Sequence, residues 1–333
     1  MRASAAAVAL LALSCAHFSD AFAESLNNVG FREMRGENGG AFGVWYPTEE
    51  TPRQIRLGPF DAEYAKDAAP DGKMLPLVVM SHGNSGYYRN HHLTAAHLAE
   101  NGFVVIAPQH IHFDDLKTHI HGRVNDIKRA RAALQNDEGF APILDADNIS
   151  AVGYSLGGAS VLAAAGVSVN WESFLLHCAR NHDKDENTCG DFPFWIRWML
   201  RAKHAFLPNP KIQFWDFSQN PVAFRKIALV APVGQMMDAE SLAKLSAEVL
   251  ILQIDGDTIL RAPFHSEHLR DNLPPRTTEY ELIRGGYHYG FVPRFSQRIP
   301  DEDLPAELID PPGFDREKFI AEINEKILAF LRK

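Results

Sequence analysis

A serine lies at the centre of residues 153–157, which read Gly-Tyr-Ser-Leu-Gly and match the pattern G-x-S-x-G. A strand-like segment (148–152) precedes the motif, and small, helix-tolerant residues (158–165) follow it. A serine on such a tight turn between a strand and a helix is presented for attack on a carbonyl carbon. The flanking glycines avoid a steric clash where the strand and the helix crowd together. The pattern therefore predicts that Ser155 is a nucleophile.

A histidine that could act as the base lies further along the chain. His288 is in a glycine-rich loop (285–290) that follows an expected strand (277–283). Catalytic groups in an open parallel sheet collect at the carboxyl ends of its strands, so this loop can reach Ser155. We expect His288 to take the proton of the serine hydroxyl and later return it to the leaving group.

Two aspartates are candidates for the acid that orients this histidine. Asp255 and Asp257 both follow the apolar run 248–254, which is typical of a buried parallel strand. We expect Asp257 to be the acid, because the Thr-Ile-Leu that follows it fits the Asp-x-apolar-apolar continuation common at this point. The alternative is Asp255, and the aspartate that is not the acid would then cap the next segment.

An oxyanion formed at the substrate needs backbone N–H groups as donors. Leu156, the residue after the serine, is expected to supply one of them. The loop 81–86 follows an apolar strand and is expected to supply the second from Asn84. Gly83 would let this loop approach the substrate, and His82 is expected to be buried and to hold the loop by a hydrogen bond.

These motifs together resemble the α/β-hydrolases of the dienelactone-hydrolase-like and platelet-activating-factor-acetylhydrolase-like group. The matching segments are 43–48, 78–83, 102–108, 123–127, 153–158, 226–232 and 285–291. The resemblance implies an α/β-hydrolase fold and serine-dependent ester hydrolysis, and it places the triad on Ser155, Asp257 and His288. Dienelactone hydrolases proper use a cysteine nucleophile, so the serine at this position favours ordinary ester hydrolysis.

The remaining patterns are those of an α/β protein, with a mostly parallel central sheet covered by helices on both faces. Expected helices are 93–100, 124–134, 263–271 and an amphipathic 316–331, with a hairpin or loop at 50–73 and an irregular segment at 299–313. Arg123 and Asp126 have the spacing of an ion pair at a helix end.

An insertion at about 167–225 separates the helix after the serine from the next strand, and it is much longer than an ordinary connection. Its position predicts a helical cap over the site. We expect most of its aromatic rings to pack as core and a few to face a substrate. These rings are Trp171, Phe174, Phe192, Phe194, Trp195, Trp198, Phe206, Phe214, Trp215, Phe217 and Phe224.

The first residues have the pattern of a signal peptide (1–23). A positive start and an apolar stretch lead to an A-x-A cleavage site that ends at Ala23. We therefore expect an exported, periplasmic or secreted, single hydrolase domain (24–333) without stable membrane insertion. Acylation of Cys15 is the alternative, which the preceding Ala-Leu-Ser disfavours because it fits a lipobox poorly.

After cleavage the chain keeps two cysteines, Cys178 and Cys189. Cysteines close in sequence in an exported protein favour a disulfide that closes a short loop. The alternative is a pair of free, buried thiols.

Composition narrows the class of partner. The chain has 333 residues, 46% hydrophobic and 23% charged, and a net charge of −9. This acidic balance disfavours nucleic acid as a partner and a basic membrane-surface patch, but it names no partner. The small-molecule ester substrate is expected from the motifs. The sequence contains no pattern that indicates an oligomeric state.

Several histidines have spacings that raise a metal site as an alternative. We expect no metal and interpret these side chains as polar loop residues. The group comprises His91, His92, His110, His112, His119 and His121, with Asp114 and Asp115 nearby.

The sequence thus predicts an exported serine carboxylesterase that forms an acyl-enzyme on Ser155 and needs no cofactor. A lipase or phospholipase activity on longer acyl chains is the alternative within enzymes, because the aromatic cap could admit them. A non-catalytic α/β-hydrolase-fold protein that binds ligands or partners is the alternative outside enzymes.

Overall fold

The computed structural model describes residues 27–37, 39–110, 116–190, 193–206 and 214–333. The expected signal peptide and Cys15 lie outside these residues. Within them, no helix combines the length and the apolar character that a membrane span requires.

A ten-stranded sheet forms the centre of the protein, in the order β12-β11-β10-β7-β5-β6-β2-β1-β4-β3. The strands from β12 to β6 in this order run parallel, and β2 joins them antiparallel to β6. The strands are β1 (Asn28–Arg35), β2 (Ala41–Thr48), β3 (Arg53–Leu57), β4 (Phe60–Lys66), β5 (Leu75–Ser81), β6 (Val104–Pro108), β7 (Leu144–Tyr154), β10 (Lys226–Val230), β11 (Glu248–Ile254) and β12 (Thr278–Ile283).

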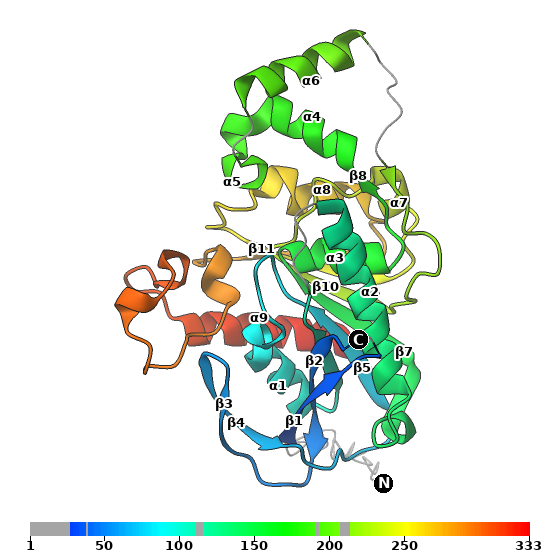
Figure 1. The fold of residues 1–333 in the computed structure, drawn as a ribbon, viewed down its shortest axis with the longest axis vertical. Coiled ribbons are helices and arrows are strands. Elements are labelled where there is room, and N and C mark those ends of the chain that lie inside the picture. Colours follow the sequence, from blue (N-terminus) through cyan, green and yellow to red (C-terminus); the bar gives the residue numbers. More distant parts are fainter. Residues whose placement is uncertain (1–26, 38, 111–115, 191–192, 207–213) are drawn as a thin grey trace, which may run out of the picture.

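Helices cover both faces of this sheet (Figure 1). Apolar residues of α1 and α9 pack on one face, and those of α2, α3, α7 and α8 pack on the other. The helices are α1 (His92–Glu100), α2 (Leu116–Gln135), α3 (Leu156–Ala164), α4 (Trp171–Asn181), α5 (Glu186–Cys189), α6 (Phe194–Phe206), α7 (Ala239–Leu242), α8 (Ser266–Asn272) and α9 (Arg316–Arg332). The expected α/β class with a mostly parallel central sheet is confirmed.

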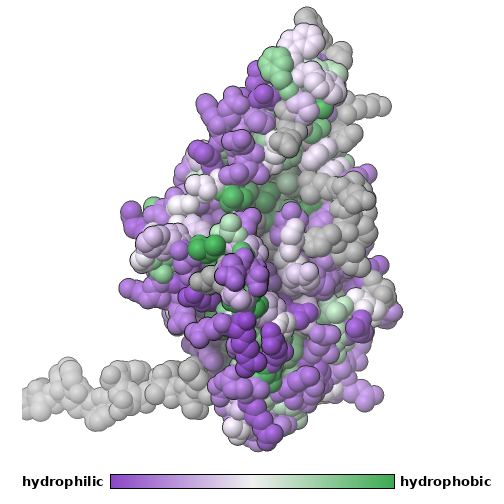
Figure 2. All heavy atoms as spheres, turned by 60° about the vertical axis from the view of Figure 1, so that its left-hand side comes forward, coloured by the Kyte–Doolittle hydropathy of each residue, from purple (hydrophilic) through white to green (hydrophobic). Residues whose placement is uncertain are grey.

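A part of the molecule formed by α4, α5 and α6 projects from one end of the long axis (Figures 1 and 2). It falls within the expected insertion. Its base carries the small antiparallel pair β8 (Val169–Asn170) and β9 (Phe214–Trp215). The disulfide between Cys178 and Cys189 joins α4 to α5, which confirms the predicted pairing.

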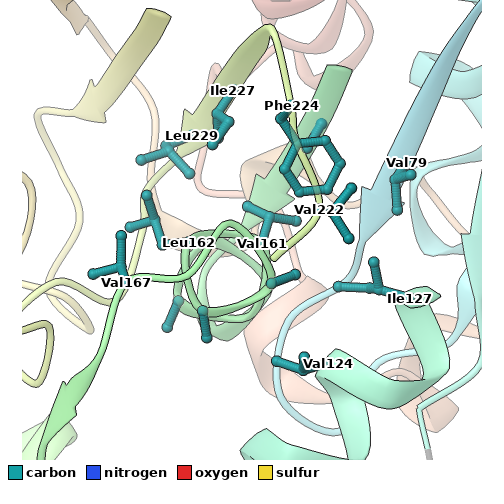
Figure 3. Packing of buried hydrophobic residues seen from close by; sticks show 14 of the residues in the cluster. Val79, Val124, Ile127, Val161, Leu162, Val167, Val222, Phe224, Ile227 and Leu229 are labelled. Carbon is teal, nitrogen blue, oxygen red and sulfur yellow. The ribbon is translucent and has the colours of Figure 1, made fainter. Parts of the chain in front are cut away.

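The strands could be predicted from the sequence because the side chains on both of their faces are buried. Consecutive residues of one strand enter opposite cores, as Val78 and Val79 of β5 do, so nearly every position is apolar. Figure 3 shows one of these cores, in which Val161 and Leu162 of α3 lie among side chains of β10 and α2. The helix α3 consists of small and apolar residues because all of them are buried.

Three local expectations can be compared with the structure. The segment 50–73 forms the antiparallel hairpin β3–β4, as one of its two interpretations predicted. The helix α2 begins at Leu116, earlier than the expected start at 124. Arg123 therefore lies inside α2 and is fully buried, so its predicted place at a helix end was wrong, although Asp126 is close enough to stabilise its charge.

The aromatic residues of the insertion divide into two groups. Phe174, Trp215, Phe217 and Phe224 are buried, and Trp171 stacks on Phe174 and Trp215. Those with exposed side chains are Phe194, Trp195, Trp198 and Phe214. Phe192 and the side chain of Phe206 lie outside the described residues. The expectation that most of these rings pack as core therefore misses a distinct exposed group on α6.

Candidate active site

Ser155 is the single residue between strand β7, which ends at Tyr154, and helix α3, which begins at Leu156. Its backbone has φ 53° and ψ −122°, a conformation that costs a non-glycine residue energy. The flanking glycines are required by space. A Cβ on Gly153 would lie 2.6 Å from the carbonyl oxygen of Gly157, and one on Gly157 would lie 1.9 Å from that of Ser81.

The structure brings Ser155, His288 and Asp257 together from three strand ends. Oγ of Ser155 lies 3.1 Å from Nε2 of His288, and Nδ1 of the same ring lies 2.7 Å from Oδ2 of Asp257. A carboxylate only accepts hydrogen bonds, so in the neutral ring Nδ1 carries the proton and Nε2 accepts from the serine hydroxyl. The side chains of His288 and Asp257 are almost completely buried.

The two candidate aspartates differ in what they bond. The second oxygen of Asp257, Oδ1, accepts the backbone N–H groups of Ile259 and Leu260 at 2.9 and 2.8 Å. Asp255 is exposed and instead accepts the N–H of Gly285 at 2.9 Å. Asp257 is therefore the aspartate that orients His288, and Asp255 fixes the loop that leads to it.

The loop after β5 lies against the serine. A Cβ on Gly83 would sit 3.3 Å from that of Ser155, so glycine lets the loop come close. His82 is buried, and its ring Nδ1 lies 2.8 Å from the carbonyl oxygen of Gly83, as the expected loop-holding role requires. Asn84 and Leu156, the expected oxyanion donors, both line the same cavity as Ser155.

Arg123 is a site residue that the sequence interpretation missed. Its buried guanidinium donates to the backbone oxygen of His82 and, through Nε, to Oγ of Ser160 at 2.7 Å. The hydroxyl of Ser160 in turn donates to the backbone oxygen of Leu156 at 2.8 Å. Burial lowers the pKa of Arg123 to about 9, and the nearby Asp126 opposes this shift. One arginine thus connects the two segments expected to form the oxyanion hole.

The loop that carries His288 has a second buried arginine. Arg316, at the start of α9, donates to the backbone oxygens of Tyr289 and Val292, which both follow His288. The hydroxyl of Tyr154 donates to the backbone oxygen of His288 at 2.8 Å. Neither the arginine nor the tyrosine contacts could be predicted from residue types, because every acceptor on the loop is a backbone oxygen.

Several histidines expected as polar loop residues are buried, which corrects that interpretation. His110 is 1% exposed and bonds Ser81 Oγ at 2.9 Å and Asp126 Oδ2 at 3.3 Å. Burial lowers the pKa of His91 to about 4 and that of His92 to about 3. His119 is buried beside Arg123. His112, Asp114 and Asp115 lie outside the described residues.

A cavity of about 460 Å³ opens over Ser155. Phe174 of α4 and Thr188 of α5 line it, so the projecting helices form part of its wall. A second cavity of about 650 Å³ adjoins it and shares Asn84 and Tyr289 as lining residues. The two cavities therefore meet at Tyr154 and the loop after β5, and each has both polar and apolar residues in its lining.

The short helix α5 holds the loop that contains Asp257. Asn187 Nδ2 donates to the backbone oxygen of Thr258 at 2.8 Å, and the hydroxyl of Thr188 donates to that of Ile259 at 3.2 Å. These contacts explain how the disulfide, which ends in α5 at Cys189, is connected to the site.

A buried carboxylate also joins the projecting helices to the main body. Asp185 Oδ2 lies 2.8 Å from His177 Nε2 and 3.3 Å from His265 Nε2. Burial by itself raises the pKa of Asp185, but the hydrogen bonds from His177 and His265 prevail and hold it well below its usual value. Atoms of His177, Asp185 and Cys189 approach within 4.8 Å, as metal ligands can. Cys189 is in the disulfide, however, so it offers no thiolate here.

No family model matches the chain, and a search of curated proteins found no similar sequence.

Proposed function

We propose that this protein is a serine hydrolase with the α/β-hydrolase fold, which cleaves carboxylic esters through an acyl-enzyme on Ser155. One observation carries the proposal. A continuous hydrogen-bonded series runs from Ser155 through His288 to Asp257, and it starts at a serine in a strained turn that faces a cavity. A serine hydroxyl, a base and an orienting acid in this geometry are the groups that nucleophilic acyl transfer requires.

The first half of the reaction acylates the enzyme. Oγ of Ser155 attacks the ester carbonyl while Nε2 of His288 takes the hydroxyl proton. The carboxylate of Asp257 stabilises the imidazolium that results, and it keeps the ring in place through its 2.7 Å contact. His288 then gives the proton to the alkoxide oxygen as the ester bond breaks, so the alcohol leaves and the acyl group stays on Ser155.

The second half releases the acid. A water molecule gives its proton to His288 and attacks the acyl carbon, and the proton returns to Ser155 when the acyl group leaves as a carboxylic acid. In both halves the negative oxygen is bound by the backbone N–H groups of Leu156 and Asn84. Residues of the chain carry out each proton transfer in this scheme, so the proposal includes no cofactor.

The resemblance of the motifs to dienelactone-hydrolase-like and platelet-activating-factor-acetylhydrolase-like enzymes supports the same proposal. The pattern of residues 1–23 adds that the enzyme is exported before it acts. The substrate in this proposal is a small-molecule ester whose two halves occupy the two cavities beside Ser155.

The proposal is tested by hydrolysis of p-nitrophenyl esters, from acetate to palmitate, by the purified mature protein beside Ser155→Ala. We expect turnover by the wild type and a loss of at least about a thousandfold in the variant. Ser246→Ala is the control variant, because Ser246 is an exposed serine that does not line the cavity over Ser155. Equal turnover by wild type and Ser155→Ala would contradict the proposal.

A further inference from the structure

One face of α6 exposes large apolar side chains. Phe194, Trp195, Trp198 and Met199 are 72, 64, 65 and 50% exposed. Residues three and four positions apart lie on the same side of a helix, so these four form one continuous stripe over two turns. We call this stripe the apolar face of α6.

The opposite face of α6 is fixed to the rest of the projection by polar contacts. Arg197 pairs with Asp183 at 3.2 Å, and Lys203 pairs with Glu172 of α4 at 3.1 Å.

Arg201 adds a third contact, from Nε to the backbone oxygen of Ala179 at 2.6 Å. An ordinary surface helix turns its apolar side inward and its charges outward. In α6 the charged side chains reach toward α4, so the aromatic side is held toward solvent.

The apolar face lies at the far end of the molecule. Figure 1 shows α6 as the outermost element along the long axis, beyond α4. The space-filling view shows pale and green side chains at the same tip, where the main body is well below them (Figure 2). A wide, flat surface can therefore reach α6 without meeting the central domain.

The chemistry of α6 fits a phospholipid surface. Tryptophan and phenylalanine are the side chains that favour the boundary between headgroups and acyl chains. The helix contains Arg197, Arg201 and Lys203 but no acidic residue, although the chain as a whole has a net charge of −9. A protruding aromatic stripe is accommodated by a fluid surface, whereas a folded protein would need a matching groove.

We infer that the apolar face of α6 binds the protein to the surface of a phospholipid bilayer. The four side chains enter the headgroup boundary, while Arg201 and Lys203 keep α6 attached to α4. The site cavity is lined by α4 and α5 and not by these four residues. Binding to lipid is therefore separable from ester hydrolysis.

The test uses the full mature chain with Ser155→Ala, so that no lipid is consumed. Its co-sedimentation is measured with vesicles of phosphatidylcholine, alone and mixed with phosphatidylglycerol. The docking variant adds Trp195→Ser and Trp198→Ser. The control variant adds Met74→Ser and Ile309→Ser instead, because these side chains are similarly exposed, at 69 and 52%, but lie outside α6.

We expect the Ser155→Ala protein with an unmodified apolar face, and the control variant, to sediment with both kinds of vesicle. The docking variant should partition at least about tenfold less, because two large apolar side chains are lost. Tryptophan emission should shift to shorter wavelength on vesicle addition with the unmodified face only, since Trp195 and Trp198 leave water. Far-ultraviolet circular dichroism verifies that all variants are folded.

Three results would overturn the inference: no vesicle binding with the unmodified face, equal binding by the docking variant, or loss of binding in the control variant. Light scattering covers the case in which a second copy of the chain occupies the face. If the unmodified protein is a dimer that does not bind vesicles, and the docking variant is a monomer, the apolar face binds a second copy of the chain instead of lipid. Turnover of p-nitrophenyl butyrate with Ser155 intact is measured separately, so failure of the hydrolase proposal is distinguishable from failure of lipid binding.

Discussion

At the scale of single residues, two buried arginines hold backbone oxygens on either side of the serine. Arg123 donates to the backbone oxygen of His82 in the loop after β5, and Arg316 donates to those of Tyr289 and Val292, which follow His288. Each arginine fixes the position of a glycine-rich loop. The residues of such a loop do not fix its conformation by themselves. The strained Ser155 between them can persist because its surroundings are held in this way.

Replacement of Asp257 by asparagine tests the assignment of the acid. An amide can present its NH₂ group to His288 and favour the wrong tautomer, so Asp257→Asn should lower kcat by roughly a thousandfold or more. Asp255→Asn is the matched control and should stay within about threefold, because its amide oxygen can still accept the N–H of Gly285. Steady-state kinetics with p-nitrophenyl butyrate measure both, and the reverse order would refute the assignment.

Arg123 is expected to act as a positioning residue for the oxyanion donors. Arg123→Met should lower kcat about tenfold to a hundredfold and leave KM nearly unchanged, because the donors act mainly on the transition state. The exposed Arg129 on the same helix provides the control, Arg129→Met. Ser160→Ala breaks the same connection with less risk to folding and should show a smaller loss of the same kind. A rise in KM at constant kcat would argue against this role.

At the scale of elements, the short helix α5 connects the disulfide to the catalytic acid. Cys189 anchors α5 to α4, and Asn187 and Thr188 hold the carbonyl groups that follow Asp257. A change in the projecting helices is therefore expected to reach the triad through the loop after β11.

The double substitution Cys178→Ser and Cys189→Ser tests this connection. Loss of so short a closed loop should lower the free energy of unfolding by up to about 3 kcal/mol. Turnover should fall several-fold at a temperature where the protein stays folded, because α5 then holds the acid loop less firmly. Urea unfolding and steady-state kinetics give the two values. Full turnover in the folded double variant would show that α5 does not position Asp257.

The elements differ in how well the sequence predicts them. Strand β11 is predicted to the residue, because burial on both faces leaves a continuous apolar run. The first turns of α2 were missed because they are rich in histidine and carry Arg123, and residue type does not indicate that these side chains are buried. The insertion is predicted only as a helical cap, and contacts with α4 decide which face of α6 is exposed.

At the scale of the whole molecule, several histidines are buried in neutral surroundings. His91 stacks on Phe291 and touches the ring of Tyr154, and His92 bonds the hydroxyl of Tyr64. Burial lowers the pKa of both rings, to about 4 and about 3, whereas in the unfolded chain it is about 6.5. Between these values the unfolded state binds more protons than the folded state.

Stability should therefore fall as the pH is lowered from about 6.5 towards 4, by a few kcal/mol in total. His91→Phe keeps a ring against Phe291 but cannot bind a proton, so it should make this pH dependence less steep. Denaturant unfolding at a series of pH values measures the effect. A slope identical to that of the wild type would mean that His91 is not a source of acid sensitivity.

Covalent labelling shows directly whether Ser155 is the nucleophile. The mature protein is treated with a fluorophosphonate beside Ser155→Ala, and the modified peptide is identified by mass spectrometry. We expect one adduct, on Ser155, with loss of ester hydrolysis in proportion to labelling and no adduct in the variant. A folded wild type that hydrolyses esters while Ser155 remains unlabelled would contradict this assignment.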